Sequence, residues 1–92
     1  MAILLTMQVG PVDWEKFRSA LDWAAQQNSP GLISSKTYRA ENDPSTVIMV
    51  QEWESHEAFH KVGDEVEPEF VARAGAESLE WQDQVWVLAH EG

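Results

Sequence analysis

Apolar residues in this chain change their spacing along the sequence, and that change limits the folds open to it. In residues 2–9 they recur at every second position, the period of a strand with one buried face. A Gly-Pro pair then stops the strand, and Asp13 stands where a helix N-cap is expected. From Trp14 to Ala24 the apolar residues recur at helical spacing. The chain therefore begins with a predicted strand followed by a predicted helix.

Three further stretches have the composition of strands. Residues 32–39 and 46–53 are rich in β-forming residues and flank the turn sequence Glu-Asn-Asp-Pro, so they predict two adjacent strands. Residues 79–90 predict a last strand. The runs Val47–Val50 and Val85–Leu88 are apolar on both faces of their predicted strands. These two strands are therefore expected to be covered on both sides.

A second helical stripe follows the third predicted strand. Ser55 is expected to cap this helix and Gly75 to end it. Gly63 and Pro68 interrupt the stripe, which predicts either two short helical pieces or a kink. The apolar positions of the stripe are Phe59, Val62, Val66 and Phe70.

The resulting order, β-α-β-β-α-β, is that of an α+β, ferredoxin-like fold in a single domain over residues 1–92. Such a fold has one antiparallel sheet with both helices on one face. The other face is normally polar, but here two strands carry apolar side chains on it as well. A second copy of the chain, packed sheet against sheet in a twofold homodimer, is the simplest cover for that face.

Charge and composition exclude several classes of partner. The net charge of −10 disfavours nucleic acids and anionic lipid surfaces, and no apolar run is long enough to span a bilayer. The chain has no cysteine, so disulfides and thiolate chemistry are excluded. Its first residues lack the features of a signal peptide, and the cytoplasm is the expected compartment by default. A neutral, apolar or cationic small molecule is the expected type of ligand.

One segment resembles a known family. A strand that ends in Glu52-Trp53-Glu54-Ser55 and a helix that opens with Glu-Ala-Phe resemble the antibiotic biosynthesis monooxygenase (ABM) family. The resemblance implies a dimeric α+β barrel with a pocket between sheet and helices in each subunit. It also implies oxidation of small, quinol-like aromatics by O₂ without a cofactor. Related barrels isomerise, cyclise or have no established activity. A non-catalytic ligand-binding or stress-associated dimeric barrel is therefore the alternative, and whether the chain is an enzyme stays open.

The chain departs from the family pattern at two points. Members often carry a histidine nine positions after the strand tryptophan, where this chain has Val62. The haem-degrading branch uses an asparagine on the first strand, and residues 1–10 contain none. Haem degradation is therefore disfavoured.

Five residues are candidates for the site on the basis of the resemblance and their positions. His60 flanks the apolar stripe of the second helix and is the candidate base, and Tyr38 is the candidate donor that orients a substrate. Trp53, His56 and Trp86 are candidates for substrate binding. For both tryptophans, packing in a core or interface is the alternative reading.

The segment His56-Glu57-Ala58-Phe59-His60 also matches the zinc-protease motif H-E-x-x-H. On a helix the two histidines lie about 40° apart, which permits a shared metal. A catalytic zinc needs a third protein ligand, however, and the first histidine falls in the first turn of the helix, where helices fray. A zinc site is therefore the minor interpretation, and no metal or other cofactor is expected.

Overall fold

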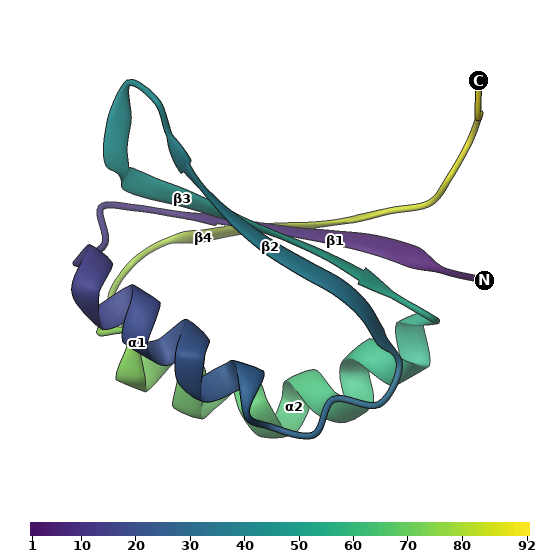
Figure 1. Cartoon of the computed structure of the whole chain (residues 1–92), viewed down its shortest axis with the longest axis horizontal. Helices are drawn as coiled ribbons and strands as arrows, with labels where there is room; N and C mark the ends of the chain where they lie inside the picture. The colour runs from purple at the N-terminus through teal and green to yellow at the C-terminus, as the bar shows by residue number, and fades with distance from the viewer.

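The computed structural model describes all 92 residues and has the predicted order of elements (Figure 1). The elements are β1 (Ile3–Val9), α1 (Trp14–Ala25), β2 (Leu32–Ala40), β3 (Asp43–Trp53), α2 (His56–Arg73) and β4 (Trp81–Trp86). The four strands form one antiparallel sheet in the order β2-β3-β1-β4. Figure 1 shows both helices on the same side of this sheet. The α+β, ferredoxin-like prediction is confirmed.

The strand β1 explains how the core forms. Its buried and less buried residues alternate, and Ile3, Leu5, Met7 and Val9 all point toward the helices. Each of these residues pairs with a residue of the neighbouring strand β3 that also points inward. The helices complete the core, chiefly through Phe17. Period-2 patterning in the sequence therefore fixed which face of the sheet is covered.

Both helices begin at the predicted caps. The Asp13 carboxylate accepts a hydrogen bond from the backbone N–H of Lys16, at 3.2 Å, and opens α1. The Ser55 hydroxyl accepts one from the backbone N–H of Ala58, at 3.1 Å, and opens α2. Each cap satisfies an N–H group that has no partner within its helix. Gly75 follows α2 with a positive φ of 66°, as expected of a residue that terminates a helix.

Of the two alternatives predicted for the second helix, the structure shows the kink and not two separate pieces. The helix α2 is continuous over eighteen residues with Pro68 inside it, and Figure 1 shows its axis bending along the sheet. Proline removes one backbone hydrogen bond and crowds the preceding turn, which bends a helix without ending it when packing holds both sides. Val62 before the proline and Phe70 after it are both buried against the sheet. Their burial keeps both sides of the proline in one helix.

The last strand is also shorter than predicted. It ends at Trp86, and Val87 and Leu88 are exposed beyond it. Trp86 pairs with Leu4, close to the start of β1, so the chain that follows has almost no partner strand to bond with. Figure 1 shows this segment running away from the sheet.

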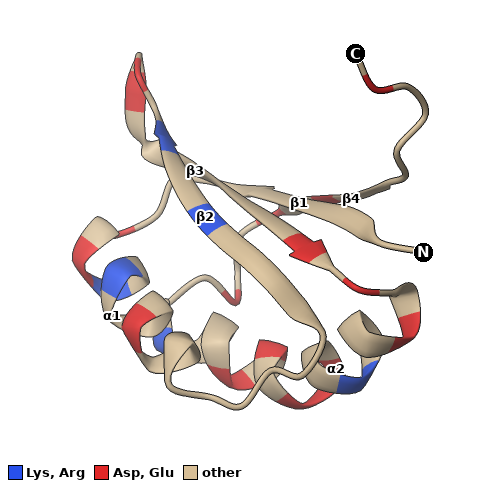
Figure 2. Ribbon diagram, turned by 45° about the vertical axis from the view of Figure 1, so that its right-hand side comes forward, with Lys and Arg blue, Asp and Glu red and all other residues tan.

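Charge is distributed unevenly over the molecule. Figure 2 shows that most acidic residues lie on the two helices and the loops, whereas the middle of the sheet carries few. Neither helix combines the length and hydrophobicity needed to cross a bilayer.

Candidate functional site

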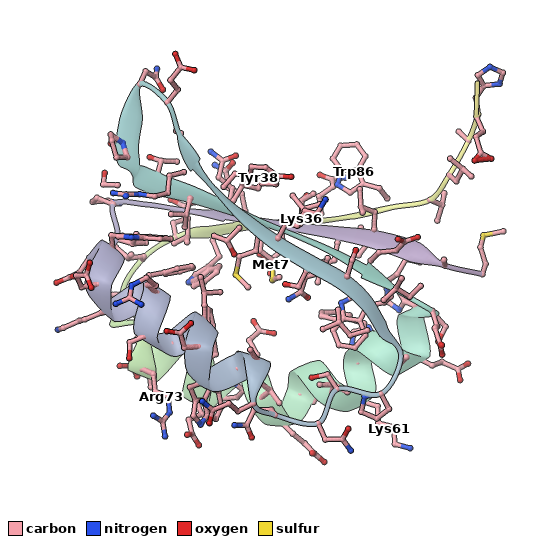
Figure 3. The ribbon with its side chains drawn as sticks, in the orientation of Figure 1. Met7, Lys36, Tyr38, Lys61, Arg73 and Trp86 are labelled. Atoms are coloured by element: carbon pink, nitrogen blue, oxygen red, sulfur yellow. The ribbon has the colours of Figure 1, made fainter.

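A cavity of about 430 Å³ lies between the inner face of the sheet and the two helices. Thirteen of its nineteen lining residues are hydrophobic, so the space is suited to an apolar ligand. Met7 and Met49 lie on the sheet side, and Figure 3 shows Met7 pointing from the sheet toward the helices. Leu21 contributes from α1, and Val62 and Val66 from α2. The cavity thus uses side chains from both layers of the fold.

A short polar chain crosses the sheet side of the cavity. The indole N–H of Trp53 donates to the side-chain oxygen of Gln51 at 3.0 Å, and the Gln51 amide nitrogen donates to Ser35 Oγ at 3.4 Å. These bonds fix the orientation of the Gln51 amide and leave its second N–H free. Together with the hydroxyls of Ser35 and Thr37, which also line the cavity, this N–H can donate to an oxygen of a ligand.

The helix side contributes one ionisable group. Glu67 on α2 is the only charged or titratable residue among those that line the cavity. Burial raises its pKa above the ordinary value, and the charges of Asp83 and Asp64 raise it further. Asp83 comes from β4, opposite the inward-facing Met7, and burial raises its pKa as well. Neither Glu67 nor Asp83 forms an ion pair or a side-chain hydrogen bond within the chain.

Of the five residues that the sequence indicated, Trp53 alone lines the cavity. It is buried, with 3% of its surface exposed, and its ring meets Phe59 edge to face at 5.7 Å between centroids. Trp53 therefore packs in the core and forms a cavity wall at once. Core packing and a place in the wall of a binding site, the two alternatives that the sequence left open for Trp53, do not exclude one another.

Tyr38 and Trp86 lie on the opposite face of the sheet. Figure 3 shows both side chains on the side away from the helices, while Met7 points toward them. Tyr38 is 52% exposed and Trp86 is 50% exposed, and the Trp86 indole N–H donates to Thr6 Oγ1 at 2.8 Å. Neither residue can reach the cavity of its own subunit.

His56 and His60 lie in the first turns of α2, with their rings 4.5 Å apart, and both are exposed. Neither is among the cavity-lining residues. No third His, Cys, Asp or Glu joins them in an arrangement that could hold a metal ion. The H-E-x-x-H match therefore lacks the third ligand that a catalytic zinc requires.

The sequence interpretation did not single out Glu67, Ser35 or Gln51. Glu67 carried a weak signal, because it falls one helical turn from both Gly63 and Val71, which line the cavity too. A carboxylate at such a position interrupts an otherwise apolar helix face. Ser35 gave no signal, because a polar residue on a strand normally indicates a face open to water.

The fold and the cavity together define a small α+β domain built around a ligand-sized apolar space. A family model described as antibiotic biosynthesis monooxygenase matches residues 1–75, and the chain belongs to that family. The resemblance seen around Trp53 is thereby confirmed. No curated protein sequence is significantly similar to the chain.

Solved structures with the same fold cover nearly the whole chain. SnoaB, a cofactor-independent oxygenase from Streptomyces nogalater, is similar with a TM-score of 0.70 at 16% identity, over 98% of this chain and 93% of its own. Rv0793 from Mycobacterium tuberculosis has a TM-score of 0.78 at 13% identity, over 99% of this chain and 98% of its own. A conserved protein from Methanosarcina mazei has a TM-score of 0.70 at 18% identity, over 94% of this chain and 91% of its own. At these identities the likeness establishes the fold.

Proposed function

We propose that the protein is a cofactor-independent monooxygenase that oxidises a small, quinol-like aromatic substrate within its cavity. The observation that carries the proposal is the cavity of about 430 Å³, mainly apolar and bordered by Trp53 and Phe59. Its size and lining fit a flat aromatic molecule. Membership of the ABM family and the likeness to a cofactor-independent oxygenase support the same reaction class.

The reaction balances without a bound redox group. A phenolic substrate loses its O–H proton, and the resulting anion supplies electrons to O₂. One oxygen atom replaces a ring C–H as a new carbonyl, and the other leaves as water, so each O₂ consumed yields one quinone and one water. The protein contributes a dry space, orientation of the ring and a proton acceptor.

The proposal extends to a homodimer formed through the outer face of the sheet. Leu4, Tyr38 and Trp86 are exposed on that face and belong to three different strands. Large apolar side chains gathered on one face of a sheet are rarely all left open to water. A second copy of the chain offers a matching surface by symmetry.

The test is oxygen uptake with a panel of phenols and hydroquinones, followed by mass spectrometry of the products formed under isotopically labelled O₂. We expect uptake above autoxidation for at least one ring, with one labelled oxygen in the product. Ala24→Phe, which fills the cavity from α1, is expected to reduce turnover at least about tenfold. Ala72→Phe places the same side chain on an exposed helix position and should leave turnover unchanged.

Three other outcomes have defined meanings. Uptake that is no greater than autoxidation, or equal in the Ala24→Phe variant, contradicts the proposal. Tight binding of an aromatic ligand without turnover supports the non-catalytic alternative. A loss of turnover in His60→Ala would assign the base to that residue despite its position outside the cavity lining.

A further inference from the structure

The cavity has a single ionisable side chain, and that side chain reaches solvent. Glu67 lines the cavity and is exposed as well, which places it at the mouth. A carboxylate in this position can accept a proton from a ligand inside and release it to water outside. No histidine, lysine, arginine or tyrosine lines the cavity that could do the same.

The charges around Glu67 are all negative. Asp83 acts on it from β4 and Asp64 acts from one turn earlier in α2, while no cation contributes. Together with partial burial, these charges raise the pKa of Glu67. A carboxylate with a raised pKa is a stronger base, and an unpaired one gains most from a ligand that donates a proton to it.

Hydrogen-bond donors lie across the cavity from this carboxylate. Gln51 belongs to β3 and Asp83 to β4, with β1 between them. Neighbouring strands are about 4.8 Å apart, so the two strands lie roughly 10 Å apart. The free N–H of Gln51 and the hydroxyls of Ser35 and Thr37 therefore lie on the β2–β3 side of the cavity, and Glu67, which feels the charge of Asp83, lies toward the β4 side.

We propose that Glu67 is the proton acceptor of the cavity, with Asp83 as a positioning residue that strengthens it, and that the ligand is an aromatic ring with oxygen at both ends. One end is a phenolic hydroxyl directed at Glu67. The other is a carbonyl or hydroxyl oxygen that accepts hydrogen bonds from Gln51 and Ser35. The same carboxylates exclude aromatic acids by repulsion.

The proton transfer is simple to write. The phenolic O–H bond breaks, the proton moves to a carboxylate oxygen of Glu67, and the electron pair stays on the substrate oxygen. Glu67 then loses the proton to water at the cavity mouth. The inference rests on the proposed function for the oxidation that follows, but binding of the hydroxyl by Glu67 does not require oxidation.

Calorimetry under anaerobic conditions tests the inference without turnover. The probes are hydroquinone, its dimethyl ether and benzoate. Wild-type protein should bind hydroquinone best and benzoate least. Glu67→Gln should weaken hydroquinone binding at least about tenfold at neutral pH. It should also reduce the ratio of the affinity for hydroquinone to the affinity for its dimethyl ether. Glu65→Gln, an exposed control on the same helix, should change neither value.

Oxygen uptake as a function of pH provides the second readout. Wild-type kcat/KM should fall at low pH as Glu67 becomes protonated. Asp83→Asn removes a negative neighbour, which lowers the pKa of Glu67, so the acid limb should move to lower pH and the maximal rate should fall, because Glu67 becomes a weaker base. The pH profile of kcat/KM for Glu67→Gln should show no acid limb, and the variant should lose most of the wild-type rate of oxygen uptake.

The outcomes separate the two proposals. If no ring is oxidised but Glu67→Gln still weakens hydroquinone binding selectively, the proposed function fails and the acceptor site stands. If Glu67→Gln oxidises substrate within about twofold of the wild type and keeps the same probe preference, the acceptor site is overturned and Glu67 is only a solvated residue at the cavity rim.

Discussion

Asp83 projects from β4 toward the helices, and partial burial raises the pKa of its carboxyl above the ordinary value for an aspartate. A raised pKa means that the folded state binds the proton more tightly than the unfolded state does. The resulting loss of folding stability is absent at a pH below the pKa that Asp83 has in the unfolded chain. It grows as the pH rises through the pKa that Asp83 has in the folded chain, and it is complete at neutral pH. The charged form of Asp83 therefore costs stability under ordinary conditions.

The variant Asp83→Asn is accordingly expected to raise the melting temperature at pH 7 and to have almost no effect at pH 3. The side chain is still partly in water, so we expect a rise of only about 1–3 °C. Thermal denaturation followed by circular dichroism at both pH values measures the difference. Glu77→Gln, in the exposed loop before β4, is the control and should change neither value. An equal shift at both pH values would mean that burial of the charge is not the cause.

Residue by residue, the sequence predicted caps and core positions better than site positions. Asp13 and Ser55 act through their own side chains on neighbouring backbone groups, so local sequence was sufficient. The orientation of Tyr38 was harder to predict, because the cavity-facing residues beside it are Ser35 and Thr37. A strand that lines a cavity with hydroxyl groups has no hydrophobic alternation to show which face is inward. The approach of Glu67 to Asp83 depends on tertiary packing between α2 and β4, which no local pattern contains.

At the scale of elements, α2 is the helix with a proline in its interior. Pro68 lies in its interior, removes the hydrogen bond to the carbonyl of Asp64 and accompanies a bend in the helix axis (Figure 1). The sequence located this disturbance but left open whether it would bend the helix or divide it. The burial of Val62 before Pro68 and of Phe70 after it stabilises the helix and offsets the loss of that backbone hydrogen bond. The order of the elements, by contrast, followed directly from the change in hydrophobic spacing.

Replacement of this proline tests whether the bend is needed. Pro68→Ala restores the backbone N–H and a better helix former, and also makes the unfolded chain more flexible. We expect a net gain of about 1–2 kcal/mol, seen as a rise in the urea midpoint at an unchanged m-value. Glu65→Ala, also exposed on α2, should gain no more than a few tenths of a kcal/mol. A loss of stability in Pro68→Ala would show that the bend is required for packing against the sheet.

At the scale of the whole molecule, the inner and outer faces of the sheet carry different features. The inner face and the helices enclose the cavity. The outer face carries apolar side chains on all four strands, with polar residues such as Thr6 and Lys36 between them. The cavity and the surface that we propose for dimerisation therefore lie on opposite faces of the sheet.

This separation predicts that the dimer can be disrupted without loss of the cavity. Val50 lies on the outer face of β3, opposite Thr6 of β1. In Val50→Asp a charge would be buried, and near a twofold axis it would also face its own copy, so the dissociation constant should rise at least about 100-fold. Light scattering after size exclusion should give twice 10.4 kDa for the wild type and 10.4 kDa for the variant. Ser19→Asp, on the exposed surface of α1, should remain dimeric. The Val50→Asp monomer should still bind hydroquinone with an affinity within about threefold of the wild type, because the cavity lies on the other face of the sheet and Val50 does not line it. A wild-type protein that stays monomeric at millimolar concentration would contradict the dimer, and a monomeric variant that loses binding would contradict the separation of the two faces.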